Sequence, residues 1–176
     1  MSEDPHSTVV VTIEAPGWST SLADGVGLCR AAGEAALAAF DAAGGEVSIV
    51  LADDDFVRAL NRNYRGRDRP TNVLSFPQGD PAGVDGVGGP RLLGDVIVAL
   101  ETVKREAAAQ GKSVADHLAH LVVHGTAHLL GFDHRTDADA DAMERREIRA
   151  LATLGIADPY RSSPDTQAAG MAAATS

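Results

Sequence analysis

Residues 124–134 read His124-Gly125-Thr126-Ala127-His128-Leu129-Leu130-Gly131-Phe132-Asp133-His134. On an α-helix, residues four apart lie on one face with about 6 Å between their Cβ atoms, so His124 and His128 can point at one metal ion. Gly131 can take the left-handed conformation that ends a helix, and His134 can then return as a third ligand. Three neutral nitrogens leave one coordination position open, which is typical of a catalytic rather than a structural zinc site.

The helix that carries these histidines is expected to be buried in the core. Ser113 and Asp116 resemble the start of a capping box, and apolar residues recur after them at helical spacing. The pattern therefore predicts a metal site on a core helix and on the turn that follows it. The apolar residues are Leu118, Leu121, Val122, Leu129 and Leu130.

Short apolar segments separated by glycine, proline and capping residues make up the rest of the chain. Their order favours an α/β fold, with α+β as the alternative, in which a single small four-stranded mixed sheet packs with about five helices. The strand order stays open at this point. We expect strands at 9–13, 47–51, 72–76 and 92–98, and helices at 22–43, 53–64, 101–110, 113–130 and after an acidic turn at 137–141.

The length and composition favour one domain with a core of its own. The chain has 176 residues, of which 44% are hydrophobic, and we expect one metal-dependent hydrolase domain over residues 1–160. Residues 161–176 are polar and rich in alanine, so we expect a disordered tail. Neither a run of about eighteen apolar residues nor a signal-peptide pattern occurs, so we expect a cytoplasmic protein without membrane association.

The charge of the chain is distributed unevenly. A formal net charge of −10 argues at first against a nucleic-acid partner, because phosphate binding generally requires excess lysine and arginine. Five arginines and one aspartate nevertheless lie within residues 58–69, so this segment carries +4 and the remainder −14. Because the local field decides binding more than the net charge does, the segment is a candidate phosphate-binding region.

The arginines of this segment fall into two groups. Arg65, Arg67 and Arg69 lie in a loop bounded by glycine and proline, where a planar guanidinium can hold a phosphate through two hydrogen bonds. We expect this group to contact phosphate groups. Arg58 and Arg62 are four residues apart on the preceding helix, and surface solvation or ion pairing explains them equally well.

One residue of the histidine motif differs from the motif of zinc proteases. The His-x-x-x-His-x-x-Gly-x-x-His frame is shared with the metzincin zinc proteases. In His-Glu-x-x-His proteases the residue after the first histidine is the glutamate that acts as general base, but here that residue is Gly125. A peptidase would therefore lack its usual base.

Three further side chains lie in or near the motif. Asp133 could cap the turn or bond the second nitrogen of a ligand histidine, and we favour the second role. His120 is too far along the helix to complete a trio with His124 and His128, since two turns span about 11 Å, and is expected to support the site or the helix packing. His117 is expected to face solvent.

The motif resembles that of the YbeY family of bacterial endoribonucleases. The resemblance runs from about Val47 to Tyr160 and rests on several segments in the expected order. Besides residues 124–134, these segments are Tyr64-Arg65-Gly66, Pro70-Thr71-Asn72-Val73-Leu74-Ser75-Phe76-Pro77, Leu93-Gly94-Asp95-Val96 and Asp158-Pro159-Tyr160.

The resemblance implies a fold, a cofactor, a reaction and a biological role. It implies an α/β fold, one Zn²⁺ per chain on His124, His128 and His134, and Arg65 as the essential catalytic arginine. The implied reaction is cleavage of single-stranded RNA. The implied role is ribosomal RNA processing, above all maturation of the 16S rRNA 3′ end, together with ribosome quality control.

Two alternative functions stay open, and a set of binding partners is expected. The protein could be a zinc metallopeptidase-like hydrolase, against which Gly125 argues, or a non-catalytic ribosome assembly factor with a structural zinc. The expected partners are single-stranded RNA, ribosomal RNA, and ribosomal or assembly-factor proteins. DNA is not expected as a partner. Because most of the chain repels phosphate, we expect weak binding to naked RNA and targeting by protein partners.

Overall fold

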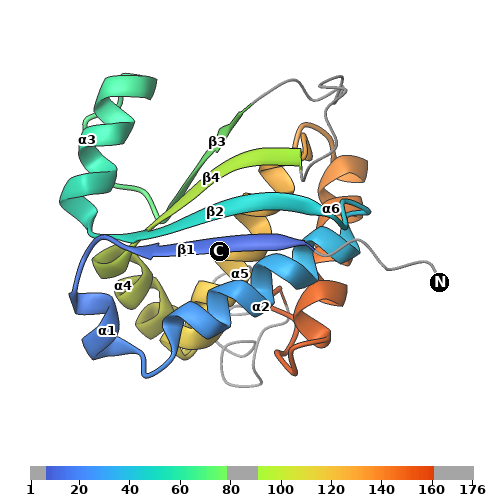
Figure 1. Ribbon diagram of the computed structural model, residues 1–176, viewed down its shortest axis with the longest axis horizontal. Helices are drawn as coiled ribbons and strands as arrows, with labels where there is room; N and C mark the ends of the chain where they lie inside the picture. The colour runs from blue at the N-terminus through green and yellow to red at the C-terminus, as the bar shows by residue number, and fades with distance from the viewer. Residues whose placement is uncertain (1–6, 79–90, 161–176) are drawn as a thin grey trace, which may run out of the picture.

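A computed structural model describes residues 7–78 and 91–160 (Figure 1). The expected tail at 161–176 and nearly all of the expected loop at 78–91 lie outside these residues. The strands are β1 (Thr8–Ile13), β2 (Gly45–Ala52), β3 (Val73–Pro77) and β4 (Arg91–Ala99). The helices are α1 (Gly17–Ser21), α2 (Gly25–Ala39), α3 (Asp54–Arg65), α4 (Leu100–Gln110), α5 (Val114–Leu129) and α6 (Asp137–Ala152).

The four strands form one mixed sheet in the order β1-β2-β4-β3. β1, β2 and β4 run parallel, and β3 pairs antiparallel with β4, which places β3 at an edge of the sheet. The predicted α/β class and four-stranded mixed sheet are thus confirmed. None of the helices in the described ranges has the length and apolar character needed to cross a bilayer.

The two faces of the sheet are covered to different extents. Along β2, the alternate residues Val47, Ile49 and Leu51 are fully buried and face a core formed with α2, α4, α5 and α6. On the opposite face, α3 packs Val57 against a smaller cluster that includes Ile97. Figure 1 shows α3 set apart from the layer that contains α2 and α5. The end of α3 therefore lies beside the edge strand β3.

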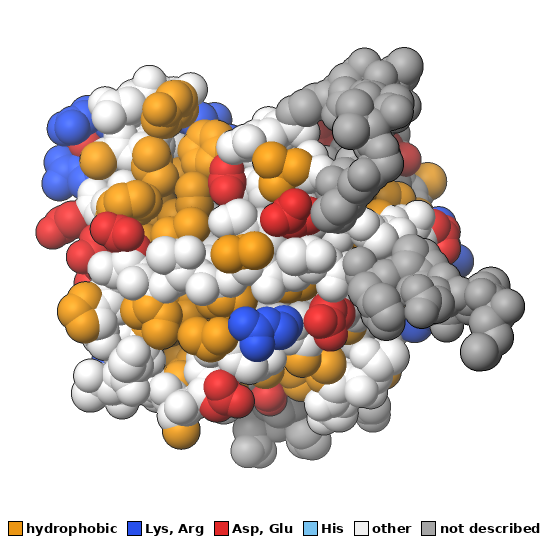
Figure 2. Space-filling model, in the orientation of Figure 1, with side chains coloured by type: hydrophobic (Ala, Val, Ile, Leu, Met, Phe, Trp, Pro, Cys, Tyr) orange, Lys and Arg blue, Asp and Glu red, His pale blue; other side chains and the backbone are white. Residues whose placement is uncertain are grey.

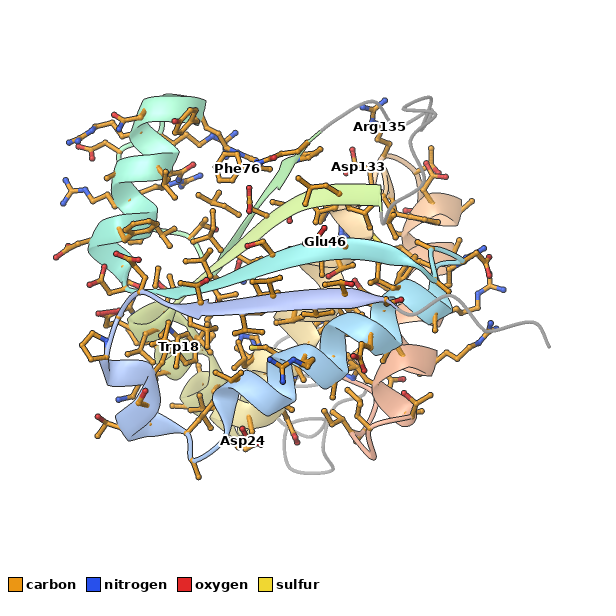
Figure 3. The ribbon with its side chains drawn as sticks, viewed as in Figure 1. Trp18, Asp24, Glu46, Phe76, Asp133 and Arg135 are labelled. Atoms are coloured by element: carbon orange, nitrogen blue, oxygen red, sulfur yellow. The ribbon has the colours of Figure 1, made fainter. Side chains whose placement is uncertain are left out.

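The first helical region differs from the prediction. A single helix over 22–43 is expected from composition, but α2 begins at Gly25 because the side chain of Asp24 accepts a hydrogen bond from the backbone N–H of Gly27. The chain before it forms the short helix α1, where the indole of Trp18 donates to the carbonyl of Ala52 at 2.7 Å. Figure 3 shows Trp18 and Asp24 on the α1–α2 side of the sheet. Residues 7–78 and 91–160 therefore contain six helices rather than the expected five or so.

Helix α5 approaches the sheet closely at Gly125. A Cβ atom added there would lie 2.7 Å from Val96 Cγ1 and 3.2 Å from both Ser75 Oγ and Val73 Cγ2. The hydroxyl of Ser75 also donates to the Gly125 carbonyl at 2.9 Å. Glycine is therefore the residue that lets α5 lie directly on β3 and β4. This contact fixes the histidine helix beside the edge of the sheet.

Replacing Gly125 with alanine is expected to destabilise the protein. Overpacking costs about 1–3 kcal/mol, whereas alanine gains at most about 1 kcal/mol over glycine inside a helix. The net loss in the free energy of unfolding should be about 1–2 kcal/mol, measured by urea denaturation of the metal-free proteins. Gly25→Ala is the matched control, because its added Cβ meets no atom closer than 3.8 Å. Equal stability of Gly125→Ala and wild type would contradict the close-packing argument.

Candidate metal centre

Helix α5 presents His124 and His128 in its last two turns. Ser113 caps its start, as the sequence predicts, by accepting a hydrogen bond from the backbone N–H of Asp116 at 3.0 Å. The apolar side of the helix is buried in the main core, with Leu118 and Val122 fully inaccessible to solvent. A core helix of this kind holds the two imidazoles on its remaining, partly exposed side.

The turn after α5 returns the chain toward the same side. Gly131 has φ = 91°, in the left-handed region. Its N–H donates to the carbonyl of His128 at 3.0 Å, and the N–H of Phe132 donates to the carbonyl of Ala127 at 3.1 Å. These two bonds are the Schellman pattern that terminates many helices. The turn brings the His134 ring into a stack on His124, with centroids 5.1 Å apart.

The three histidines converge. His124 Nε2 and His128 Nε2 lie 3.0 Å apart, and donor atoms of all three residues lie within 4.8 Å of one another. In a tetrahedral zinc site with Zn–N bonds of 2.0–2.1 Å, ligand nitrogens are separated by about 3.3 Å. Burial, together with the neighbouring His124 and His134, lowers the pKa of His128. A neutral imidazole is the form that binds metal, so the group fits a zinc ion or another metal that prefers nitrogen ligands.

A buried carboxylate that sequence patterns did not indicate supports His124. Glu147, on α6, is fully inaccessible to solvent, and its Oε1 lies 2.6 Å from His124 Nδ1. Burial alone would raise the pKa of Glu147, but hydrogen bonds with His120, His124 and Tyr160 outweigh this effect and lower it to about 2. With the carboxylate ionised, Nδ1 of His124 carries the proton and donates. Nε2 is then the free nitrogen that faces the metal position.

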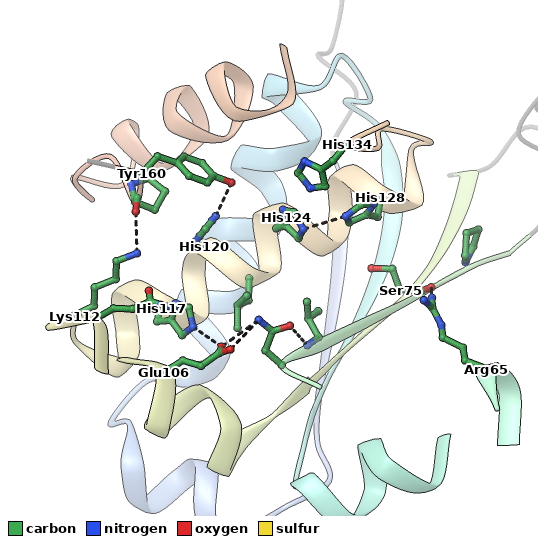
Figure 4. A pocket seen from close by; sticks show the side chains of 16 residues that line it. Arg65, Ser75, Glu106, Lys112, His117, His120, His124, His128, His134 and Tyr160 are labelled. Carbon is green, nitrogen blue, oxygen red and sulfur yellow. Dashed lines mark hydrogen bonds and ion pairs between the residues drawn. The ribbon is translucent and has the colours of Figure 1, made fainter. Parts of the chain in front are cut away.

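Tyr160 and His120 complete the surroundings of this carboxylate. The Tyr160 hydroxyl donates to Glu147 Oε2, and His120 Nε2 lies 3.2 Å from the same hydroxyl and 3.5 Å from Glu147 Oε2. Lys112 donates to the carbonyl of Pro159, the residue before Tyr160, at 3.0 Å. His120 therefore lies next to the ligand-supporting carboxylate, and Figure 4 shows it beside Tyr160.

Asp133 does not bond a ligand histidine's ring, which was the favoured hypothesis for this residue. Its carboxylate accepts hydrogen bonds from the backbone N–H of His134 at 2.8 Å and from Arg135 Nε at 3.1 Å. Among the hydrogen bonds of the described residues, none joins Asp133 to a histidine ring nitrogen. Figure 3 shows Asp133 and Arg135 together at this turn. The geometry is that of the alternative role, a cap that stabilises the turn.

The expectation that His117 faces solvent is wrong. Only 3% of the residue is exposed, and its Nε2 lies 2.9 Å from Glu106 Oε1 on α4. Asn72 Nδ2 donates to the same carboxylate oxygen at 3.1 Å. Helical spacing alone could not reveal this, because the partner of His117 lies on another helix, α4.

One cleft joins the histidines to Arg65. The cleft has a volume of about 810 Å³ and is lined by His124, His128, His134, Ser75 and Arg65, among others. Arg65 is the last residue of α3, where Gly66 ends the helix with φ = 68°, and its guanidinium donates to the carbonyl of Ser75 at 3.3 Å. Figure 4 shows Arg65 reaching the edge strand from the side opposite the histidines.

The other arginines of the segment are separated from this cleft. Arg67 and Arg69 line an adjoining hollow of about 350 Å³, to which Arg65 also contributes. Arg58 forms an exposed ion pair with Asp68, with 2.8 Å between Nε and Oδ1, which agrees with ion pairing at the surface. The structure thus brings Arg65 into one cleft with the histidines and places Arg67 and Arg69 in the adjoining hollow.

The packing at Gly125 disfavours the base of a zinc protease. A Cβ built on this residue would lie 2.7 Å from Val96 Cγ1, closer than a Cβ atom normally approaches a neighbour. A glutamate at this position would therefore force the surrounding side chains or α5 to shift. The close contact of α5 with the sheet thus argues against a His-Glu-x-x-His base.

Comparison with known proteins identifies the family. A family model described as "Endoribonuclease YbeY" matches residues 27–155. The chain belongs to the endoribonuclease YbeY family. Proteins named endoribonuclease YbeY from Paramagnetospirillum magneticum and Azorhizobium caulinodans are 51% and 53% identical to it. The first alignment covers 86% of this chain and 94% of the relative, and the second covers 85% and 94%.

A solved structure shares the fold. The solution structure of TM1509 from Thermotoga maritima aligns with 89% of this chain and 98% of its own, with a TM-score of 0.56 and 21% sequence identity. At this level of identity the likeness concerns the fold alone. It agrees with the predicted and observed α/β architecture.

Glu147→Gln is expected to weaken metal binding. The amide keeps the size of the side chain but loses the charge that holds His124, and such changes typically reduce metal affinity about 10- to 100-fold. Competition between the protein and a chromogenic zinc chelator would measure the affinity. Asp141→Asn is the matched control, since it removes an exposed carboxylate from the same helix. Unchanged zinc affinity in Glu147→Gln would contradict the supporting role.

The burial of His117 predicts a dependence of stability on pH. Burial lowers the pKa of His117 below its usual 6.5, although the hydrogen bond to Glu106 opposes this shift. Below pH 6.5 the unfolded chain therefore binds a proton that the folded protein resists, and stability falls as the pH decreases. His117→Gln should show a shallower decline in the free energy of unfolding between about pH 7 and 5.5. Parallel pH profiles for both proteins would disprove this assignment.

Proposed function

We propose that this protein is a zinc-dependent, single-strand-selective endoribonuclease of the cytoplasm that processes ribosomal RNA. Maturation of the 16S rRNA 3′ end and ribosome quality control are the proposed roles. The observation that carries the proposal is the single cleft that holds three convergent histidines and Arg65. Membership of the endoribonuclease YbeY family supports RNA as the substrate and makes the protein a hydrolase of phosphodiester bonds.

In this proposal His124, His128 and His134 hold one zinc ion. When bound, zinc supplies Lewis acidity and lowers the pKa of a coordinated water to about 7. Glu147 keeps His124 in the tautomer that presents Nε2, and the lowered pKa of His128 keeps that ring neutral near neutral pH. The four side chains thus maintain the nitrogen donors in the form that zinc requires.

Arg65 has the role of stabilising charge on the substrate phosphate. Its guanidinium is exposed at the cleft, and within the described residues its hydrogen bond is a single one, to the Ser75 carbonyl, so it can turn toward a phosphate. Its permanent positive charge and planar set of donors suit a phosphate that gains negative charge during cleavage. Arg67 and Arg69, in the adjoining hollow, are proposed to bind neighbouring phosphates of the same strand.

The charge distribution supports a need for partners. Outside residues 58–69 the chain carries a net charge of −14, which repels RNA away from the arginine loop. Ribosomal or assembly-factor proteins are therefore the proposed means of delivering the enzyme to its substrate. Tight, salt-insensitive binding to arbitrary RNA would contradict this part of the proposal.

Arg65→Ala should abolish most of the cleavage of single-stranded RNA while zinc content stays the same. Loss of a group that stabilises transition-state charge typically lowers kcat about 100- to 1,000-fold. Cleavage of a labelled single-stranded RNA, together with metal analysis, tests this. Arg62→Ala, which removes an exposed arginine one turn earlier on α3, is the matched control, and His128→Ala should lose both zinc and activity. Full activity of zinc-loaded Arg65→Ala would refute the catalytic role.

Three further measurements distinguish the route of RNA cleavage and the two alternative functions. Attack by water leaves no cyclic ester at the break, whereas attack by the 2′-hydroxyl of the RNA leaves a 2′,3′-cyclic phosphate. Zinc-dependent cleavage of peptides with no cleavage of RNA would favour a metallopeptidase. Melting on zinc removal, in a protein that never cleaves RNA when intact, would favour an assembly factor with a structural zinc.

A further inference from the structure

An aromatic side chain is exposed beside the cleft without a structural reason. Tyr64 precedes Arg65 in the last turn of α3, and 72% of it is accessible to solvent, more than any other large hydrophobic residue in the described ranges. Its ring does not fill the core, because α3 packs on the sheet through Val57 and Leu60 instead. Exposure of this extent leaves a ring face available to another molecule.

The Tyr64 ring nevertheless has a fixed neighbour. It packs edge-to-face against Phe76 of β3, with centroids 5.6 Å apart and an interplanar angle of 67°. The guanidinium carbon of Arg65 lies 6.0 Å from the centroid of the same Phe76 ring. Tyr64, Phe76 and Arg65 thus form one cluster, which we call the aromatic corner. Figure 3 shows Phe76 beside the end of α3.

The aromatic corner is continuous with the cleft. Arg65 belongs to both, since it contacts the Phe76 ring on one side and the carbonyl of the cleft residue Ser75 on the other. Successive side chains of a strand point to opposite faces, so Ser75 faces the cleft and Phe76 faces α3. Figure 2 shows hydrophobic side chains gathered between α3 and the neighbouring strands. A ligand held by Arg65 can therefore extend from the cleft over the edge of β3 onto this surface.

We propose that Tyr64 is a specificity-determining residue that stacks on a base of the RNA strand whose phosphate Arg65 holds. The inference rests on the proposed ribonuclease function. Nucleobases stack on exposed aromatic rings, and the adjacent guanidinium binds the phosphate that links them. The tyrosine ring is suited to this, because it loses little conformational freedom on binding.

This arrangement gives a physical source for selection of single strands. In a duplex each base is paired and stacked between its neighbours, so neither of its faces can reach a protein ring. Only an unpaired base can leave the strand and lie on Tyr64. The stacking energy is then gained by single-stranded RNA and not by a duplex of the same sequence.

Stopped-flow anisotropy with a short labelled single-stranded RNA, recorded before cleavage, tests the proposal on the zinc-loaded protein. Tyr64→Ala should weaken binding about 10-fold or more, while Tyr64→Phe and Tyr64→Trp should retain it. Binding to a duplex of the same sequence should not change. In steady-state cleavage, Tyr64→Ala should raise KM with kcat little changed, because stacking binds the substrate and its transition state alike.

Phe56→Ala is the matched control, since Phe56 is an exposed aromatic residue at the opposite end of α3. It should leave RNA binding unchanged. An RNA with an abasic nucleotide beside the cleaved bond should bind wild type and Tyr64→Ala equally, because the base that Tyr64 contacts is missing.

Two outcomes would overturn the proposal. One is equal binding of intact single-stranded RNA by Tyr64→Ala and wild type. The other is that Tyr64→Ala weakens binding of the abasic RNA as much as binding of the intact RNA, at every position of the abasic nucleotide that is tried. If wild type binds RNA in a Tyr64-dependent manner but does not cleave it, the stacking site stands and the proposed catalytic function fails. If wild type binds no single-stranded RNA, the stacking site fails as well.

Discussion

The direct contact between α5 and the sheet at Gly125 is the constraint on which the site depends. Because no Cβ separates the helix from Val96 and Ser75, the histidines of α5 share a cleft with Ser75 of the edge strand, which Arg65 reaches from α3. The same contact disfavours the glutamate that a protease of this frame carries at this position. Close packing thus determines both which groups meet in the cleft and which one is missing from it.

The buried carboxylate of Glu147 connects the metal centre to α6 and to Tyr160. An isolated buried charge would be costly, but His120, His124 and Tyr160 surround it with donors. The last helix and the segment that follows therefore contribute to the electrostatics of the metal centre as well as to packing. Loss of Tyr160 would leave one oxygen of a buried anion without its hydroxyl donor.

Local patterns were sufficient to predict the parts of the structure that depend on local geometry. The four-residue histidine spacing, the Ser113 cap and the left-handed Gly131 all concern neighbouring residues. The strand order, the partner of His117 and the role of Glu147 depend on contacts between different segments, such as His124 and Glu147, which are 23 positions apart. The start of α2 at Gly25 does have a local cause, the cap Asp24, but the surrounding stretch is rich in helix-forming residues and favours an earlier start.

The edge strand β3 also poses a problem of solubility. The bonds from Ala99 to Asn72 and from Gln78 to Leu93 show that even-numbered residues of β3 pair with β4, so the backbone groups of Val73, Ser75 and Pro77 point outward. Unpaired edges of this kind invite another strand to add itself to the sheet. Here Pro77 has no N–H to offer, the side chain of Asn72 accepts from the Val73 N–H, and Arg65 occupies the Ser75 carbonyl. The arginine proposed for catalysis therefore also occupies an outward-facing acceptor of this edge, which disfavours the addition of another strand.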